Sequence, residues 1–282
     1  MMRVAVIGAT GVIGRHVVPR LREHGHEVRA LVRAETDAGA LRAVGIDAAQ
    51  GDIFDIQSLR QALEGCAAAL HLATAVPRPG QTPNWALNDR IRREGTANLL
   101  EACRNTGVRR YVQQSIAFLV GGTPDLLDET APLLPARQAT ASAIDMERLV
   151  TASGLDWVIL RGGALYGPGT GRDEHWRALA RSGELRLPGD GSDYISLIHV
   201  ADLAECFVLA AERAPSGSIL AGVDDEPTTY RELFGYIAGL ASSPAPTAGG
   251  ATNFPSFRIS NAKARETLGW RPCYRSYRSG LA

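Results

Sequence analysis

Short apolar runs and amphipathic stretches alternate along the first 160 residues. Val4–Ile7 is a β-branched run that predicts a strand, and residues 14–24 carry apolar side chains at helical spacing. The same alternation predicts further strands at 28–32, 67–72, 110–114 and 157–160, the end of a short third strand at 50–52, and helices at 38–43, 56–63, 90–106 and 140–153. Strands and helices in strict alternation predict an α/β fold with a doubly wound parallel sheet and helices on both of its faces.

The pattern changes near residue 170, where the chain becomes rich in loops. We therefore expect a sheet domain over residues 1–169, joined by a returning segment near 192–212. Residues 170–282 are expected to form a smaller substrate-binding lobe that does not fold independently and covers the carboxyl ends of the strands. Ser242–Gly250, a Ser/Pro/Ala/Gly stretch, is the best candidate for a mobile loop.

Charge and composition exclude several classes of protein. Lysine plus arginine and aspartate plus glutamate are balanced at 30 each, so we expect no nucleic-acid or anionic-membrane partner. The four cysteines are far apart, which predicts neither a metal site nor a disulfide framework. No secretion signal and no run of about 18 apolar residues is evident, so we expect a cytoplasmic protein. Lys263 is the only lysine.

The segment Gly8-Ala-Thr-Gly-Val-Ile-Gly lies between the first predicted strand and helix. In that context Gly8 allows the tight turn, Gly11 lets the backbone approach a pyrophosphate, and Gly14 permits close helix packing. The loop predicts a dinucleotide-binding site of Rossmann type, to which Thr10, Val12 and Ile13 also belong. A glycine-rich turn without a ligand is the alternative.

The cofactor preference is read from the end of the second strand. NAD-specific sites usually have an acidic residue there, whereas this chain has Arg33, whose forked donors suit a 2′-phosphate. We predict NADP(H), with NAD(H) as the alternative because Glu35 is near. The other predicted cofactor contacts follow later strands: Asp52 and Ile53 beside the adenine, Leu72, Ala73 and Thr74 near the ribose, and Gln114 and Gly162.

Several further motifs occur in order along nearly the whole chain: His71-Leu-Ala-Thr, Gly95-Thr-Ala-Asn, Arg110-Tyr-Val-Gln-Gln-Ser, Tyr166-Gly-Pro-Gly, His199-Val-Ala-Asp and Asn261-Ala-Lys-Ala-Arg-Glu-Thr-Leu-Gly-Trp. With the glycine loop, they resemble the NAD-dependent epimerase/dehydratase family, the extended or atypical branch of the short-chain dehydrogenases/reductases. The resemblance implies a Rossmann fold that binds a nicotinamide dinucleotide. It also implies a homodimer formed through the helices at 90–106 and 140–153.

The chain departs from that family at the expected catalytic positions. The family uses Ser or Thr together with Tyr-x-x-x-Lys, in which the lysine lowers the pKa of the tyrosine. Ser115 matches the serine, but the tyrosine and lysine positions align with Ala139 and Ala143. Arg92 replaces the asparagine that usually precedes Gly-Thr. Three of the four active-site residues are therefore absent.

Three residues remain as catalytic candidates. Ser115 could hydrogen-bond a substrate oxygen, Tyr166 could offer a phenol beside the nicotinamide, and His199 could carry a proton near neutral pH. A structural role is the alternative for each. Arg172, Trp176 and Tyr194 are candidate substrate contacts in the smaller lobe, with packing or exposure as the alternative.

These observations leave several functions open for a protein with a small-molecule substrate. The first is an NADP(H)-dependent oxidoreductase, or an epimerase or isomerase, acting on a small carbonyl or hydroxyl compound. The second is a lyase, cyclase or dehydratase that has kept the fold without net redox chemistry. The third is a non-enzymatic NADP(H) sensor, motivated by a retained glycine loop beside lost catalytic residues.

Overall fold

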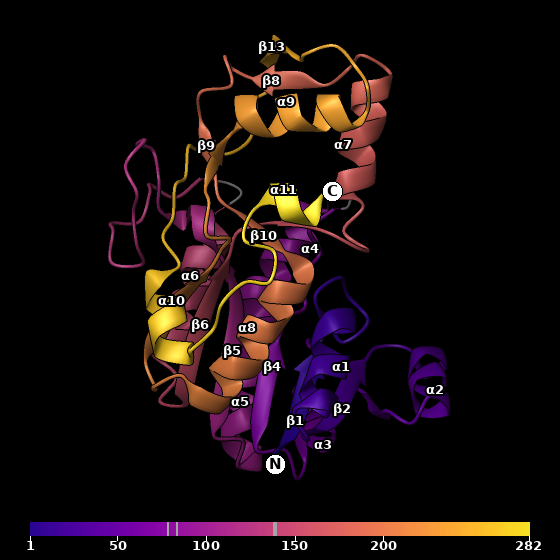
Figure 1. Cartoon of the computed structure of the whole chain (residues 1–282). Helices are drawn as coiled ribbons and strands as arrows, with labels where there is room; N and C mark the ends of the chain where they lie inside the picture. The colour runs from indigo at the N-terminus through magenta and orange to yellow at the C-terminus, as the bar shows by residue number, and fades with distance from the viewer. Residues whose placement is uncertain (78, 83, 138–139) are drawn as a thin grey trace.

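A seven-stranded sheet forms the centre of the molecule (Figure 1). The computed structural model describes residues 1–77, 79–82, 84–137 and 140–282. The sheet order is β3-β2-β1-β4-β5-β6-β11, and every neighbouring pair is parallel. Its strands are β1 (Arg3–Ile7), β2 (Glu27–Val32), β3 (Asp47–Gln50), β4 (Ala68–His71), β5 (Arg110–Ile116), β6 (Asp156–Gly162) and β11 (Ser218–Gly222). The predicted doubly wound Rossmann sheet is confirmed.

Helices cover both faces of this sheet. One face carries α1 (Gly14–Glu23), α8 (Val200–Arg213) and α10 (Ala262–Leu268), and the other carries α3 (Ile56–Leu63), α5 (Thr96–Thr106) and α6 (Ala141–Thr151). Val4 and Val6 of β1 pack into the first layer, whereas Ala5 and Ile7 pack into the second. Burial on both faces of the sheet explains why the parallel strands are continuous apolar runs in the sequence.

The remaining helices of this part lie at its margins. The helix α2 (Glu35–Ala43) packs beside β2 and β3, and α4 (Trp85–Arg90) continues through a π-helical turn, η1 (Ile91–Gly95), into α5. The third strand covers 47–50, so it ends at the first residue of the predicted 50–52. Its start was not predicted, because this edge strand is short and half-exposed and gives no clear apolar run. The seventh strand, β11, was not predicted.

The C-terminal part adds a second hydrophobic cluster, which includes Trp176, Leu233, Phe234 and Ile237. Three two-stranded sheets frame it, and Figure 1 shows α7, α9, β8 and β13 together at the end of the molecule away from the N-terminus. The elements are η2 (Ala117–Leu119), β7 (Ala164–Tyr166), α7 (Arg172–Arg181), β8 (Arg186–Pro188), β9 (Tyr194–Ile195), β10 (Leu197–His199), β12 (Thr228–Thr229), α9 (Tyr230–Leu240), β13 (Thr247–Gly250) and α11 (Tyr277–Gly280). The division of the chain at residue 170 stays a prediction.

The stretch expected as a mobile loop, 242–250, is partly ordered by pairing. Its last four residues form β13, which runs parallel to β8, and Gly250 approaches the backbone oxygen of Arg186 closely. A small residue is needed there because a Cβ on Gly250 would lie 2.9 Å from that oxygen.

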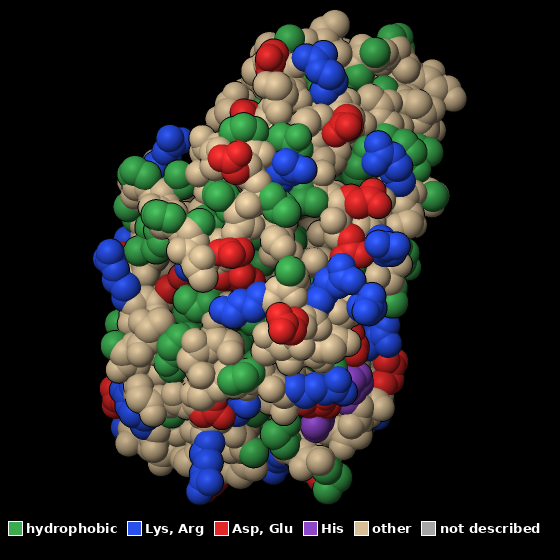
Figure 2. All heavy atoms as spheres, turned by 60° about the vertical axis from the view of Figure 1, so that its left-hand side comes forward, with side chains coloured by type: hydrophobic (Ala, Val, Ile, Leu, Met, Phe, Trp, Pro, Cys, Tyr) green, Lys and Arg blue, Asp and Glu red, His purple; other side chains and the backbone are tan. Residues whose placement is uncertain are grey.

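The surface shows no dominant charge. Figure 2 shows basic and acidic side chains interspersed over the face in view, as the balanced composition suggests. Within the described residues, no helix has both the length and the apolar character needed to cross a bilayer. The same residues contain no group of three or more metal-ligating side chains. Cys66, Cys103 and Cys206 are buried free thiols, and Cys273 is exposed.

Candidate functional site

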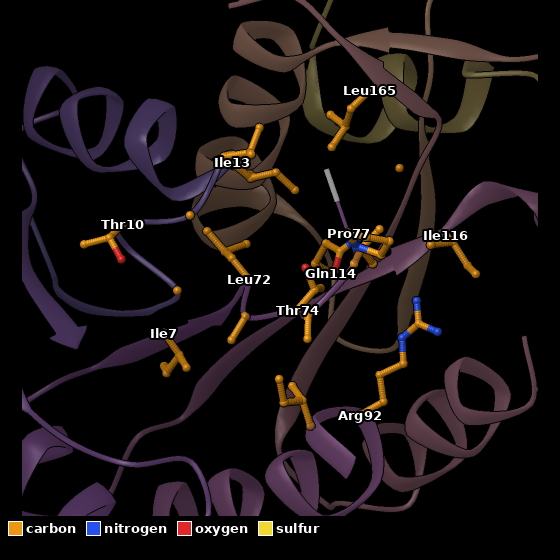
Figure 3. A pocket seen from close by; sticks show the side chains of 18 of the residues that line it. Ile7, Thr10, Ile13, Leu72, Thr74, Pro77, Arg92, Gln114, Ile116 and Leu165 are labelled. Carbon is orange, nitrogen blue, oxygen red and sulfur yellow. The ribbon is translucent and has the colours of Figure 1, made fainter. Parts of the chain in front are cut away.

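A cavity of about 530 Å³ opens at the carboxyl ends of the parallel strands (Figure 3). Residues that end four strands line it: Ile7, Val32, Ile116 and Gly162. Its volume lies within the roughly 300–1,000 Å³ range of ligand pockets. Ligands of doubly wound folds bind at this edge, so the cavity is the candidate functional site.

The glycine loop forms one wall of the cavity with a tight backbone turn. The Gly11 N–H donates to the Gly8 oxygen at 2.9 Å, and Gly8 has a φ of 93°. A Cβ on Gly14 would lie 2.2 Å from the same oxygen, and one on Gly8 would lie 2.8 Å from the Ala73 nitrogen. The loop therefore fits the cradle that a dinucleotide pyrophosphate needs, with the amino end of α1 directly behind it.

Arg33 lies at the end of the cavity next to β2 and α2. Its side chain is exposed and lines the cavity, and no carboxylate of the described residues forms an ion pair with it. Glu35 is engaged elsewhere, because its carboxylate accepts from Arg42 at 2.6 Å. The guanidinium of Arg33 is thus available to an anionic group on the cofactor.

Most of the other predicted cofactor residues line the same cavity. Those that do are Gly8, Thr10, Gly11, Val12, Ile13, Arg33, Ile53, Leu72, Ala73, Thr74, Gln114 and Gly162. Gly14 and Asp52 do not. Gly14 supports the loop from behind, and the Asp52 carboxylate accepts from the Phe54 N–H at 2.9 Å within its own turn. Their assignment as cofactor contacts stays a prediction.

Ser115 lies beneath the cavity surface, in a buried ionic network. It is 1% exposed, and its hydroxyl donates to Glu147 Oε1 at 2.6 Å. The other partner of Glu147 is Arg161 of β6, at 2.7 and 3.0 Å. The serine does not line the cavity, and its proton is directed toward the carboxylate. Its predicted contact with a substrate oxygen would require this network to open.

The predicted lysine position, Ala143, is fully buried in α6, and the predicted tyrosine position, Ala139, lies outside the described residues. Glu147 lies one turn further along α6, where it meets Arg161 of β6. Asp145 on the same helix instead pairs with Arg93 at 2.8 Å. The two acidic residues therefore lie on different faces of α6, as their spacing predicts.

Tyr166 and His199 lie together, away from Ser115 and outside the cavity lining. They are paired across β7 and β10, with ring centroids 5.2 Å apart, and the His199 ring stacks on Tyr274 at 3.8 Å. Burial raises the pKa of Tyr166 and lowers that of His199. The three candidate catalytic residues therefore do not form one group, and their catalytic roles stay predictions.

The described residues that line the cavity include no tyrosine, histidine, cysteine or lysine. Their titratable members are Asp37, Arg33, Arg92 and Arg172. Arginine stays protonated under all physiological conditions, and Asp37 belongs to α2 at the Arg33 end. The part of the cavity near β5 and β6 is thus without an ordinary acid–base side chain in the described part of the chain.

An aromatic wall of the cavity could not be found from sequence patterns. Phe118 follows β5, whereas Phe254 and Phe257 come from the C-terminal part, more than 130 residues away. The ring centroids of Phe118 and Phe254 are 5.0 Å apart, and those of Phe118 and Phe257 are 5.8 Å apart. Only the tertiary fold brings them together, and no local motif marks them.

Comparisons with known proteins agree with this geometry. A family model described as NAD(P)H-binding matches residues 8–208. The 3-diazoavenalumate denitrifying reductase of a Streptomyces species is 37% identical, with 99% of each chain covered. The UDP-glucose 4-epimerase of Mycolicibacterium smegmatis is 30% identical over 96% of this chain and 94% of its own. The structure of MoeE5 in complex with UDP-glucose and NAD has a TM-score of 0.81 at 28% identity, with 99% and 96% covered.

Substituting Gly14→Ala should abolish dinucleotide binding, because its Cβ would collide with the Gly8 and Ala9 backbone oxygens and displace the loop. Titration calorimetry with NADPH measures this, and we expect at least about a hundredfold weaker binding, roughly 2.7 kcal/mol. Gly39→Ala in α2 is the control, because nothing lies within 4 Å of its Cβ. Unchanged NADPH affinity in Gly14→Ala would contradict the assignment.

Asp224 makes the free energy of unfolding depend on pH. The residue is 2% exposed beside His199, and burial raises its pKa from 3.8 to about 8. The folded state therefore keeps a proton that the unfolded state releases, so the free energy of unfolding falls as pH rises toward 8. The buried His71 does not contribute above pH 6.5, since burial lowers its pKa to about 4.

Between pH 6.5 and 8 we expect Asp224 to lower the free energy of unfolding by about 1 kcal/mol per pH unit. Denaturant unfolding at a series of pH values measures the slope. Asp224→Asn should flatten it, because the amide cannot titrate and its oxygen can still accept from the His199 N–H. Equal slopes in the two proteins would show that Asp224 titrates normally.

Proposed function

Because this chain belongs to the NAD(P)H-binding epimerase/dehydratase family, the extended branch of the short-chain dehydrogenases/reductases, we propose that it is an NADP(H)-dependent reductase of a small electrophilic molecule. One observation carries the proposal. Among the described residues that line the cavity near β5 and β6, none has a side chain that exchanges a proton near neutral pH. The reaction is therefore one in which the protein binds and orients its ligands without supplying a proton.

This observation favours reduction over epimerisation. Epimerisation through oxidation of a hydroxyl needs a base to accept the hydroxyl proton. Ala143 stands at the lysine position, and the Ser115 hydroxyl donates to Glu147 in a buried network. Reduction that displaces a leaving group from carbon needs a hydride and no proton, so it does not require such a side chain.

A diazo compound is the substrate class that best matches this chemistry. A reduced nicotinamide supplies a hydride, which at an arenediazonium carbon replaces the nitrogen, so that N2 leaves with the bonding pair and no proton is consumed. Among the relatives, the reductase that is 37% identical over the full length is named for a diazo substrate and for denitrification. A carbonyl compound, with its proton taken from water, is the second class that the cavity admits.

The residues near β5 and β6 provide orientation and exclude water. Ile116, Leu165 and Phe257 give this region apolar walls. The Gln114 side-chain amide donates to the Ser115 backbone oxygen at 3.0 Å, which fixes it at the strand end. Holding two reactants in such a fixed, apolar space lowers a barrier without any acid or base.

The preference for NADP(H) rests on Arg33. Its guanidinium lines the cavity at the β2 end, and Glu35 is held by Arg42 rather than by Arg33. A guanidinium without an ionic partner in the described structure matches the oxygens of a 2′-phosphate.

Arg33→Asp should remove the cofactor preference. We expect NADPH to bind at least about tenfold tighter than NADH, a gap of roughly 1.4 kcal/mol, and the substitution to erase it. Titration calorimetry with both cofactors measures the gap. Arg22→Asp makes the same charge change in the last turn of α1, outside the cavity lining, and should leave the gap intact. A gap that survives Arg33→Asp would assign the preference to other residues.

The reaction itself is tested with 4-carboxybenzenediazonium and NADPH under anaerobic conditions. We expect the protein to accelerate NADPH oxidation over the uncatalysed mixture, with one N2 and one benzoate formed per NADPH consumed. The Gly14→Ala variant is the matched control and should not exceed the uncatalysed rate. If neither this probe nor a panel of aldehydes and ketones oxidises NADPH faster than buffer, the reductase proposal is wrong.

A further inference from the structure

We propose that the substrate is a planar aromatic or conjugated carboxylic acid, whose carboxylate is bound by Arg172 with Arg92 as a second cation of the same cavity. This inference rests on the proposed function, since it names the substrate class of that site. Its first support is the distribution of charge. Among the described lining residues, Asp37 is the one carboxylate, and it lies in α2 at the Arg33 end of the cavity. Arg92 lies in η1 and Arg172 in α7, so neither belongs to the elements that form that end. A cavity of this charge favours an anionic ligand.

Arg172, the first residue of α7, has donors that the described structure does not use. Its guanidinium forms no ion pair with a described carboxylate, and it lies over the Trp176 ring at 5.5 Å. The neighbouring Asp173 attracts it electrostatically, but that carboxylate accepts from the Gly167 N–H at 3.0 and 3.1 Å and forms no ion pair with Arg172 in the described structure. A planar guanidinium fixed on an aromatic ring presents two parallel donors, which match the two oxygens of a carboxylate.

Arg92 adds a positive charge from a different element. It lies in η1, is 5% exposed, and donates through Nη1 to Ser142 Oγ at 3.3 Å. Figure 3 shows its side chain reaching toward Ile116 at the end of β5. This arginine therefore places a cation in the cavity lining from an element other than α7.

The aromatic wall supports a flat, conjugated ligand. The rings of Phe118, Phe254 and Phe257 line the cavity with edge-to-face or tilted contacts, 5.0 and 5.8 Å between centroids. Such a cluster presents ring faces and edges to a further planar ring, which it binds through offset or edge-to-face packing. The backbone of Phe257 is held by its N–H bond to Tyr194 O at 3.0 Å, so the wall is anchored to β9.

Binding of cinnamate to the protein saturated with NADP+ tests the inference without turnover. Calorimetry should show cinnamate binding at least about tenfold tighter than methyl cinnamate, and tighter than UDP-glucose. Arg172→Gln should remove that tenfold difference, whereas Arg181→Gln, a charge removal at the far end of the same helix, should keep it. Thermal melting verifies that both variants are folded. Arg172→Lys keeps the positive charge without the two parallel guanidinium donors. It should therefore lose less of the preference for cinnamate over methyl cinnamate than the glutamine variant does.

Several outcomes would overturn the inference. These are equal binding of acid and ester, a preference that survives in Arg172→Gln, or UDP-glucose binding tighter than cinnamate. The result is separable from the reductase proposal. Selective, Arg172-dependent binding of cinnamate without NADPH oxidation by any probe would uphold the acid site and reject the reduction. NADPH oxidation with no preference for the carboxylate would uphold the reductase proposal and reject the acid site.

Discussion

The close approach of the helix start to the first strand is the constraint on which the site depends. A side chain at Gly14 would place carbon 2.2 Å from the Gly8 oxygen, so helix α1 can begin there only with glycine. Because the turn is this tight, the amino end of α1 and the free edge of the loop face the same space. The strands end along that space, because all of them are parallel and their carboxyl ends therefore lie at the same edge of the sheet. The cavity is therefore a consequence of the turn and of the sheet order.

A second constraint separates the redox cofactor site from proton chemistry. Glu147 and Arg161 form a buried ion pair to which Ser115 donates its hydroxyl proton. A buried pair is tolerated only when its remaining donors and acceptors are satisfied, and the serine supplies one such bond. The residue that the family uses to hold a substrate oxygen is thus used here to complete an internal network. In the proposed reaction, the adjacent cavity contributes positioning and apolar walls.

The sequence predicted the parts of the structure that local patterns encode. Strand β1, the glycine loop and α1 follow from a β-branched run, fixed glycine spacing and helical periodicity over residues 4–23. The start of strand β3 was not predicted, because a four-residue edge strand with exposed ends has no strong pattern. The environment of Ser115 could not be predicted, since its partner lies 32 residues away on another element. The same holds for Phe254 and Phe257, which reach the cavity only through the tertiary fold.

In the proposed reaction, hydride reaches the substrate without a proton-donating side chain. Isotope effects on NADPH oxidation with 4-carboxybenzenediazonium test it most directly. Deuterium at the transferred position of NADPH should slow the reaction, with a ratio of the rates for light and deuterated NADPH of at least about 2. The rates in H2O and D2O should agree within about 20%, because no proton moves in the step that breaks the C–H bond. A solvent isotope effect of about 2 or more, measured with this acceptor, would contradict the account and indicate a proton donor in the site.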